Sequence, residues 1–582
     1  MLRCENLTVR PAGDASAAPI LNHVSVAFQP RAMNALIGPS GCGKTTLVKA
    51  MLGLAPVEAG GGVWLGGERI SRPEELVGRV GFAPQFSIAQ PKLTVEETLR
   101  YALELCVADT SVRAARLGNV LGVVGLAEHR HKRVESLSGG QLRRLGLGLE
   151  LTVDPPTLIC DEVTSGLDPI SENQILELLR GLAERRGKTI VCIIHNLAKL
   201  SGFEWITVVY AGEVVFQGRY EALQGYFAIT DPLHLYEILN AQPGDYWSRR
   251  WREANGPALA ADRERWDTDG AATAGEPPPS PHIPAAATGP VAPGRLPSAA
   301  AQFGTLLRRK TRLFMRDHGY LSLMLAITFG FPVMVVIFAL SGLPQISSPS
   351  LLQPQGASVE AIRAQLNYAI EAAKTSSLVT GLIMFQVILL TLMGANNAAR
   401  EIAGERLLYE KERLTGLRPS AYAASKLVFT GLLALFQGVW MTGFVKVICV
   451  MPGPWLAQTA ILALACLAMT WVCLAFSALM ASPEKASTLS IYLVGFQLPL
   501  SGVVLALPSY LVWVCRPFIN AYWGWAGYLY SMEQTRLYDA FTYTNPNTWV
   551  ADTAQAGAVL AGHAVIGAAI AWWGCQRRRW TA

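Results

Sequence analysis

The pattern of hydrophobic and polar residues changes about halfway along the chain. In the first part, short β-branched or apolar runs alternate with stretches of helical period; the runs are 24–28, 35–37, 77–82, 157–160, 189–194 and 206–209. This alternation is typical of an α/β domain with a largely parallel sheet. We therefore predict one domain of this class over residues 1–246.

The second part carries apolar segments long enough for the roughly 20 residues that a membrane-spanning helix needs. These segments are 320–340, 376–395, 427–451, 455–480, 489–507 and 554–574. They predict an all-α transmembrane domain with six helices over residues 300–582. A seventh candidate, 510–529, contains Arg516 and Asn520, and counting it as a span would place Arg577, Arg578 and Arg579 outside. The positive-inside bias favours six spans with both termini in the cytoplasm, and 510–529 as a re-entrant or interfacial piece.

Three segments connect these domains or flank the membrane. Residues 247–299 are rich in Pro, Ala and Gly and predict an extended linker. Within them, 248–265 carries Arg and Trp at helical spacing, so it either lies on the membrane surface or caps the first domain. Residues 303–317 are basic and amphipathic and predict an interfacial helix.

Composition supports an integral membrane protein. Of the 582 residues, 51% are hydrophobic and only 16% are charged. The net charge of +6 comes from positive residues clustered beside apolar runs, so we expect membrane orientation and no nucleic-acid partner. The ten cysteines lack C-x-x-C spacing and are expected to be reduced. The first thirty residues lack an apolar signal core, so we expect no export of the N-terminus.

A phosphate-binding loop is predicted at residues 38–46, which read GPSGCGKTT. It follows an apolar run and precedes a helical pattern, the setting that such a loop requires. Lys44 would bring a positive charge to the phosphates, and the Thr45 hydroxyl would bind Mg²⁺. The residues expected to hold the nucleotide here are Gly38, Ser40, Gly41, Gly43, Lys44, Thr45 and Thr46.

Two adjacent carboxylates and a histidine follow later apolar runs. Asp161 ends the run 157–160, where a carboxylate can hold Mg²⁺ or its water shell. Glu162 would orient or deprotonate the attacking water; the alternatives are a second carboxylate beside the metal or a charge at a helix start. His195 follows the run 189–194 and is expected to contact the γ-phosphate. Ser138, Gly139 and Gly140 precede a helical pattern that begins at Gln141, which predicts a second phosphate-binding helix N-terminus.

The order of these motifs resembles the ATP-binding cassette of ABC transporters: GPSGCGKTT, Gln85 in GFAPQ, LSGGQ at 137–141, LICDE at 158–162, SGLD at 165–168, and His195. The resemblance implies ATP and Mg²⁺ as cofactors, with Gln85 near the metal and water and Asp168 in the nucleotide site. It also implies that the loop 138–141 closes over the nucleotide of a second cassette. A homodimer is therefore expected, with a heterodimer possible.

One feature departs from the pattern of the cassette family. That family usually stacks an aromatic ring on the adenine ahead of the phosphate loop, and no aromatic residue precedes Phe28 here. Val9 and Arg10 are the candidate substitutes.

The domain order resembles the G subfamily of ABC transporters, the White group, and its bacterial relatives. These are half-transporters that dimerise and export sterols, lipids, pigments or amphipathic drugs. A charged segment, 400–426, follows the second predicted span, as in that group. We interpret it as a coupling element, the alternative being a solvated loop, with these residues as candidates: Glu405, Arg406, Glu410, Glu412 and Arg413.

In that family the substrate pathway is lined by spans two and five. The corresponding candidates here are Phe385, Gln386, Met393, Phe496 and Gln497, with ordinary helix packing as the alternative for each. No charged residue lies mid-span among them, which argues against a strongly ionic cargo. Lys446, near the end of the third span, is expected to extend its ammonium group toward the membrane surface.

The sequence as a whole predicts a multi-pass protein of a bacterial inner membrane. We expect it to hydrolyse ATP and to export a hydrophobic or amphipathic molecule such as a lipid, a sterol-like compound or a drug. The alternatives are a membrane-anchored ATPase that regulates a partner complex without moving cargo, and an importer or polysaccharide exporter.

Overall fold

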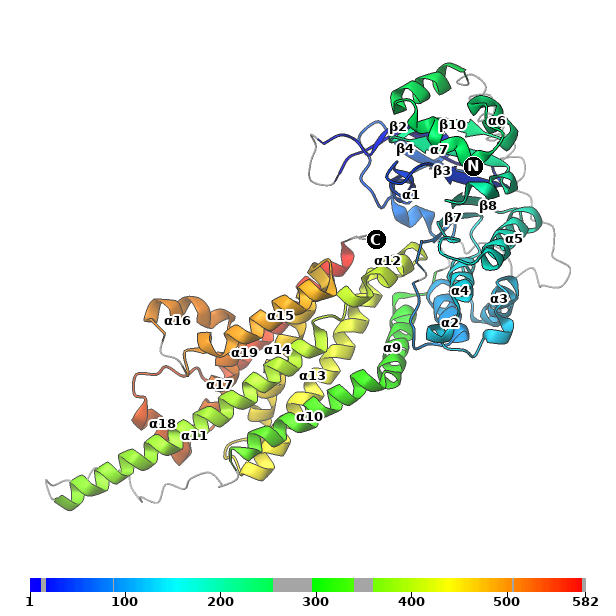
Figure 1. Ribbon diagram of the computed structural model, residues 1–582. Helices are drawn as coiled ribbons and strands as arrows, with labels where there is room; N and C mark the ends of the chain where they lie inside the picture. Colours follow the sequence, from blue (N-terminus) through cyan, green and yellow to red (C-terminus); the bar gives the residue numbers. More distant parts are fainter. Residues whose placement is uncertain (12–16, 87, 255–295, 340–358, 505–506, 578–582) are drawn as a thin grey trace. The chain divides into compact units, whose positions relative to one another are not determined.

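The computed structural model describes residues 1–11, 17–86, 88–254, 296–339, 359–504 and 507–577 (Figure 1). The chain forms two compact units: Met1–Thr305 with Leu407–Arg418, and Leu306–Arg406 with Pro419–Ala582. The centre of the predicted linker, 255–295, and the basic residues Arg578 and Arg579 lie outside the described residues.

The first unit contains two sheets. A four-stranded antiparallel sheet has the order β2-β1-β4-β5, and a six-stranded sheet has the order β10-β9-β3-β8-β7-β6. In the larger sheet β10 is antiparallel to β9, and the other strands pair in parallel. The strands are β1 (Leu2–Val9), β2 (Leu21–Ala27), β3 (Met33–Ile37), β4 (Gly62–Leu65), β5 (Glu68–Ile70), β6 (Val80–Ala83), β7 (Thr157–Asp161), β8 (Thr189–Ile193), β9 (Trp205–Tyr210) and β10 (Glu213–Gly218).

All six predicted strands are confirmed, and the predicted α/β class with them. One of them, β2, belongs to the antiparallel sheet. Strands β1, β4, β5 and β10 were not predicted. Strand β5 is only three residues long and reads ERI, so it carries no alternation that a sequence pattern can detect.

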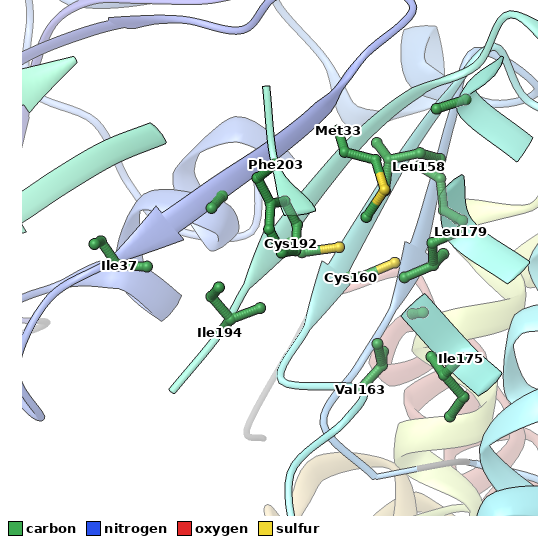
Figure 2. Packing of buried hydrophobic residues seen from close by; sticks show 14 of the residues in the cluster. Met33, Ile37, Leu158, Cys160, Val163, Ile175, Leu179, Cys192, Ile194 and Phe203 are labelled. Carbon is green, nitrogen blue, oxygen red and sulfur yellow. The ribbon is translucent and has the colours of Figure 1, made fainter. Parts of the chain in front are cut away.

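Helices pack on the larger sheet through a continuous apolar core. Figure 2 shows Leu158, Cys160 and Cys192 beside Met33, with Ile175 and Leu179 of α5 packed close to them. Because both faces of a parallel sheet are covered, its strands read as near-continuous apolar runs. The helices of this unit are α1 (Lys44–Met51), α2 (Val95–Cys106), α3 (Thr110–Val123), α4 (Gly139–Leu151), α5 (Pro169–Arg186), α6 (Tyr220–Phe227), α7 (Leu235–Asn240) and α12 (Arg406–Leu414).

The tryptophan-bearing stretch 247–254 caps the first unit. Trp247 and Trp251 are buried in the core, with ring centroids 5.4 Å from Phe227 and 5.1 Å from Phe216, respectively. Aromatic rings in such contact bury large apolar areas. Of the two readings of 248–265, the structure favours the cap over a membrane-surface helix; residues 255–265 lie outside the described residues.

The second unit is helical, and Figure 1 shows α11, α13, α14 and α19 running alongside one another. Helix α9 (Ala299–Arg316), predicted as the basic amphipathic helix, begins at the end of the first unit and continues here. The others are α10 (His318–Ile337), α11 (Val359–Ala398), α13 (Pro419–Cys449), α14 (Trp455–Leu479), α15 (Pro483–Gln497), α16 (Ser509–Cys515), α17 (Asn520–Tyr530), α18 (Arg536–Thr544) and α19 (Thr553–Gln576).

Within the described residues, five helices are long and apolar enough to cross a membrane, so the predicted count of six is not confirmed. The helices in question are α10, α11, α13, α14 and α19. The predicted span 489–507 falls on α15, which ends at Gln497; Pro499 and then Gly502, at φ +71°, follow. Proline interrupts a helix because it lacks an amide hydrogen and clashes with the preceding turn. Residues 510–529 form α16 and α17 rather than one long helix.

Lys446 of α13, predicted to extend its ammonium group toward the membrane surface, binds the segment that follows the end of its helix, and its depth in a membrane stays a prediction. Its side chain is buried, and Nζ donates to the carbonyl oxygen of Gly453 at 2.8 Å and to the side chain of Gln458. Carbonyl oxygens within the unit therefore solvate this ammonium group in place of water, since a buried charge must be hydrogen-bonded.

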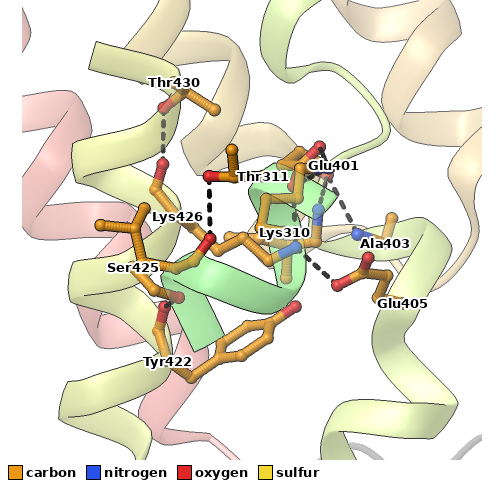
Figure 3. A network of polar contacts seen from close by, with 12 residues as sticks. Lys310, Thr311, Glu401, Ala403, Glu405, Tyr422, Ser425, Lys426 and Thr430 are labelled. Carbon is orange, nitrogen blue, oxygen red and sulfur yellow. Dashed lines mark hydrogen bonds and ion pairs between the residues drawn. The ribbon is translucent and has the colours of Figure 1, made fainter. Parts of the chain in front are cut away.

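A network of four charged side chains lies inside the second unit (Figure 3). Lys426 Nζ donates to Glu401 Oε1 at 2.7 Å and to Glu405 Oε2 at 2.5 Å, and Lys310 Nζ donates to Glu401 Oε2 at 2.7 Å. The predicted coupling residue Glu405 is thus an internal ion-pair partner. Each carboxylate is paired with an ammonium group, which offsets part of the cost of removing these charges from water.

Replacing Lys426 with methionine should destabilise this unit. The change removes a cation that contacts both carboxylates, and breaking a buried pair in this way costs roughly 3 kcal/mol or more. We expect a clearly lower midpoint of thermal unfolding for the purified protein in detergent. The matched control is Lys485→Met at an exposed position, which should shift the unfolding free energy by no more than about 0.5 kcal/mol. Equal midpoints for the two variants would contradict the prediction.

Candidate functional site

The phosphate loop connects β3 to α1, and its glycines are required by geometry. Gly38 has φ +152°, and a Cβ atom there would lie 2.0 Å from the carbonyl oxygen of Val209. Gly43, at φ +101°, is the N-cap of α1. Only glycine adopts these conformations without steric cost, so the loop can follow a path that points its amides toward a bound anion.

The other predicted residues of this loop differ in solvent exposure. Lys44 is buried, and its Nζ donates to the carbonyl oxygens of Gly38 at 2.7 Å and Pro39 at 2.8 Å. Ser40, Gly41 and Thr45 are exposed, and Thr46 is half-buried. The loop therefore holds its lysine against its own backbone, while the hydroxyl groups of Ser40 and Thr45 remain accessible.

The three residues predicted to be catalytic lie together at the carboxyl edge of the larger sheet. Gln85 Nε2 donates to Glu162 Oε2 at 2.8 Å, and His195 Nε2 lies 2.5 Å from Glu162 Oε1. Glu162 has φ +51°, a left-handed conformation that costs a non-glycine residue about 1 kcal/mol or more. The two side-chain contacts hold the carboxylate at one place and orientation. Its side chain is 14% exposed, so a water molecule can reach it.

Asp161, one residue earlier, offers a position for a divalent cation. The side chain is buried, and Oδ1 has no hydrogen-bond partner among the described residues. Burial and the neighbouring charge of Glu162 raise the pKa of Asp161 to about 6. A buried carboxylate oxygen without a donor is satisfied by a metal ion, and Mg²⁺ prefers such oxygen ligands. Asp161, the Thr45 hydroxyl and the Gln85 amide therefore fit the predicted metal site in their chemistry.

Residues 138–141, the predicted second phosphate-binding site, form the start of α4. Ser138 Oγ accepts from the Gln141 amide at 3.3 Å, and Gln141 Oε1 accepts from the Ser138 amide at 3.1 Å. This reciprocal pair is a capping box, which satisfies two of the free amides at a helix start. Ser138 and Gly139 are exposed and Gly140 is half-buried, so the helix N-terminus is open to an anion.

Asp168, predicted in the nucleotide site, is the N-cap of α5. Its Oδ1 accepts from the amides of Ile170 at 3.1 Å and Ser171 at 2.9 Å. These hydrogen bonds, chiefly those from Ser171, lower the pKa of Asp168. The role of Asp168 that the structure shows is to cap the start of α5. Its contact with nucleotide stays a prediction.

Tyr236 of α7 was not predicted. Its hydroxyl accepts a hydrogen bond from the Gly38 amide at 3.3 Å, so a residue almost two hundred positions away contacts the first glycine of the phosphate loop. Burial raises the pKa of Tyr236 to about 12. No sequence signal marks this tyrosine, since the contact depends on where α7 packs.

The two candidates for holding the adenine differ in accessibility. Val9 is buried in the core of the first unit and presents no face to a ligand. Arg10 Nε donates to Glu58 Oε1 at 2.6 Å, and its Nη1 donates to the carbonyl oxygen of Ala17 at 2.6 Å. Between the two, only Arg10 offers a planar group near the surface, and that group is already hydrogen-bonded.

The predicted coupling residues divide between the two units. In the second unit, Arg406 is buried and donates to the carbonyl oxygens of Ser477 and Ala478, at 3.3 and 2.5 Å. In the first unit, Arg413 and Glu410 form a buried ion pair at 3.5 Å, and Glu412 is half-buried. These side chains pack inside the protein, which argues against the alternative of a solvated loop.

The predicted substrate-pathway residues do not share one exposed face. Phe496 is exposed and Phe385 half-buried, whereas Met393, Gln386 and Gln497 are buried. The side chain of Gln497 accepts from the Ala521 amide at 3.0 Å and so joins α15 to α17. The Gln386 amide group has no hydrogen-bond partner among the described residues.

Comparison with known proteins identifies two family regions along the chain. Residues 21–165 match the family described as ABC transporter, and residues 301–523 match the family described as ABC-2 type transporter. The ABC transporter ATP-binding/permease protein Rv1747 of Mycobacterium tuberculosis is 27% identical over 538 residues, which cover 89% of this chain and 56% of that protein. This chain therefore spans little more than half the length of that relative.

Two further relatives each match less than half of the chain. The methionine import ATP-binding protein MetN of Rhodospirillum rubrum is 32% identical over 41% of this chain and 70% of its own length. The ABC transporter G family member 8 of Arabidopsis thaliana is 32% identical over 36% of this chain and 35% of its own length. The chain belongs to the ABC transporters, with an ATP-binding cassette followed by an ABC-2 type membrane domain.

Proposed function

We propose that the protein hydrolyses ATP to export a hydrophobic or amphipathic molecule, and that it works as a dimer. The observation that carries the hydrolytic part is the Glu162 carboxylate, held by Gln85 and His195 next to Asp161. A carboxylate fixed in this way can accept a proton from the water that attacks the γ-phosphate. A bound Mg²⁺ would neutralise phosphate charge, with Asp161, Thr45 and Gln85 as its protein ligands.

The open start of α4 supports the dimer. The exposed Ser138 hydroxyl and the amides that follow it are suited to a phosphate group. In our proposal they contact the nucleotide bound to residues 38–46 of a second copy. The match to G family member 8 of Arabidopsis, a member of the subfamily that the domain order resembles, supports the same arrangement.

The composition of the membrane helices supports an apolar or amphipathic cargo. Residues 375–399, which include most of the apolar part of α11, contain no charged side chain, and neither do residues 486–497 of α15. A strongly ionic cargo would need charged partners in the membrane, because an isolated charge there is costly. We further propose a bacterial inner membrane with the cassette in the cytoplasm, where ATP is available.

The Glu162→Gln variant should separate hydrolysis from binding. We expect ATP hydrolysis to fall by about 10²-fold or more, because the general base is lost, while ATP binding persists. The protein is reconstituted in phospholipid vesicles, and ATP-dependent movement of a fluorescent phospholipid analogue is measured together with phosphate release. Glu177→Gln, at an exposed position of α5, is the matched control. ATP-dependent binding of a partner protein without movement of any probe would instead support the regulatory ATPase.

Mixed dimers test whether each site is built from two copies. Lys44→Ala and Ser138→Phe should each abolish hydrolysis in a homodimer. A dimer of one copy of each, isolated through two different affinity tags, regains one intact pair of Lys44 and Ser138. We expect its ATPase activity to exceed that of both parents, and no gain would count against the shared site.

Tyr236→Phe should weaken ATP binding without stopping hydrolysis. The change leaves the Gly38 amide without its acceptor, and a hydrogen bond of this kind contributes about 1 kcal/mol. We expect roughly a fivefold higher KM for ATP and a kcat close to that of the unmodified protein. Tyr210→Phe removes a hydroxyl that donates to Asn240 on the surface and serves as the control. Equal KM values in both variants would show that Tyr236 has no role in the loop.

A further inference from the structure

A buried carboxylate of the first unit joins its own helix to two other elements that no sequence motif connects to it. Glu150 lies near the end of α4, and its side chain is 2% exposed. Its Oε2 accepts from the Phe82 amide of β6 at 3.0 Å, and its Oε1 lies 3.0 Å from Lys411 Nζ of α12. The Lys411 side chain is 5% exposed, so water screens this ion pair very little.

The two charged atoms depend on each other. Among the described residues, neither Glu150 Oε1 nor Lys411 Nζ has a hydrogen-bond partner. Removing a charge from water costs several kcal/mol, and only a well-placed opposite charge offsets that cost. Any displacement of α12 from α4 would therefore leave two charges without a partner. The ion pair for this reason favours movement of the two helices as one body.

Two of the three elements lead directly to the nucleotide site. Helix α4 starts after Ser138 and is 13 residues long, a rigid rod of about 20 Å. Strand β6 ends at Ala83, two residues before Gln85, whose amide donates to Glu162. Glu150 thus lies where α4 and β6, the strand that leads to Gln85, meet α12.

A second buried contact holds the chain just after α12 within the same unit. Gln302, fully buried, donates from Nε2 to the carbonyl oxygens of Leu105 at 2.8 Å and Gly416 at 3.0 Å. Its Oε1 accepts from the Arg418 amide at 3.0 Å. Residue 419 begins α13, so only a short connection, bound at Gly416 and Arg418, separates α12 from that helix in the chain.

We propose that Glu150 and Lys411 are a positioning pair that passes the state of the nucleotide site to α12 and so to the start of α13. The inference rests on the proposed function, since it assigns the residues through which ATP binding acts on the membrane domain. The pair touches neither nucleotide nor cargo. It acts by making α4, β6 and α12 respond together.

The test is hydrogen–deuterium exchange of the full-length protein in detergent. The parent carries Glu162→Gln so that MgATP stays bound, and exchange is compared with and without MgATP. In the parent we expect an ATP-dependent change at residues 38–46 and at 407–426. Adding Glu150→Gln and Lys411→Met together removes both charges, keeps the volumes similar, and leaves an oxygen at position 150 to accept from Phe82. We expect the change at 407–426 to shrink about fivefold or more, with the change at 38–46 retained.

Two controls separate a positioning role from a structural one. Lys411→Arg keeps a cation near Glu150 and should keep the response at 407–426. Lys92→Met removes an exposed ion pair with Glu135 in the same unit and should also leave it unchanged. A full response at 407–426 in the doubly neutral variant would overturn this inference alone. The absence of any ATP-dependent change at 407–426 in the parent would overturn the transport proposal as well.

Discussion

The parallel order β3-β8-β7-β6 is the constraint on which the candidate site depends. The carboxyl ends of parallel strands meet at one edge of a sheet, so the segments that follow these strands start as neighbours. Lys44 follows β3, Asp161 and Glu162 stand at the end of β7, His195 follows β8 and Gln85 follows β6. The left-handed backbone at Glu162 costs conformational energy. The hydrogen bonds of its carboxylate with Gln85 and His195 help to stabilise this conformation.

Both units bury charged side chains, and in each case the charges come from different elements. Glu150 and Lys411 join α4 to α12 in the first unit, and Lys426 joins two carboxylates in the second. Such pairs contribute little net stability compared with apolar packing, but they penalise any other arrangement of the same elements. Such pairs therefore favour the movement of the paired helices together, which an ATP-driven protein needs. An apolar contact allows more arrangements of the same helices and so selects among them less strictly.

In the membrane domain, hydropathy does not predict where one of the helices ends. The apolar composition of 489–507 predicts a span, yet the backbone breaks at Pro499 and Gly502, so α15 ends after Gln497. Neighbouring residues also differ in role, because Phe496 is exposed and Gln497 binds the Ala521 amide. Composition records how apolar a stretch is, whereas the length of a helix depends on its hydrogen bonds and turns.

The sequence by itself determined the motifs of the ATP-binding cassette and their order. Each motif is local: a glycine turn, an acidic strand end or a helix start is complete within a few residues, and its spacing carries the physical requirement. The α/β class and the six predicted strands were likewise readable from alternation.

Only the tertiary structure decided which distant residues complete these local motifs. Tyr236 reaches Gly38 because α7 packs near the loop, and Glu150 meets Lys411 although it looks like an isolated charge in the apolar run LGLGLEL. The burial of Lys446 is of the same kind. In each case the partner is a carbonyl, an amide or a charge supplied by another element. A sequence pattern encodes the face and period of its own element, but not the neighbour that the fold brings to it.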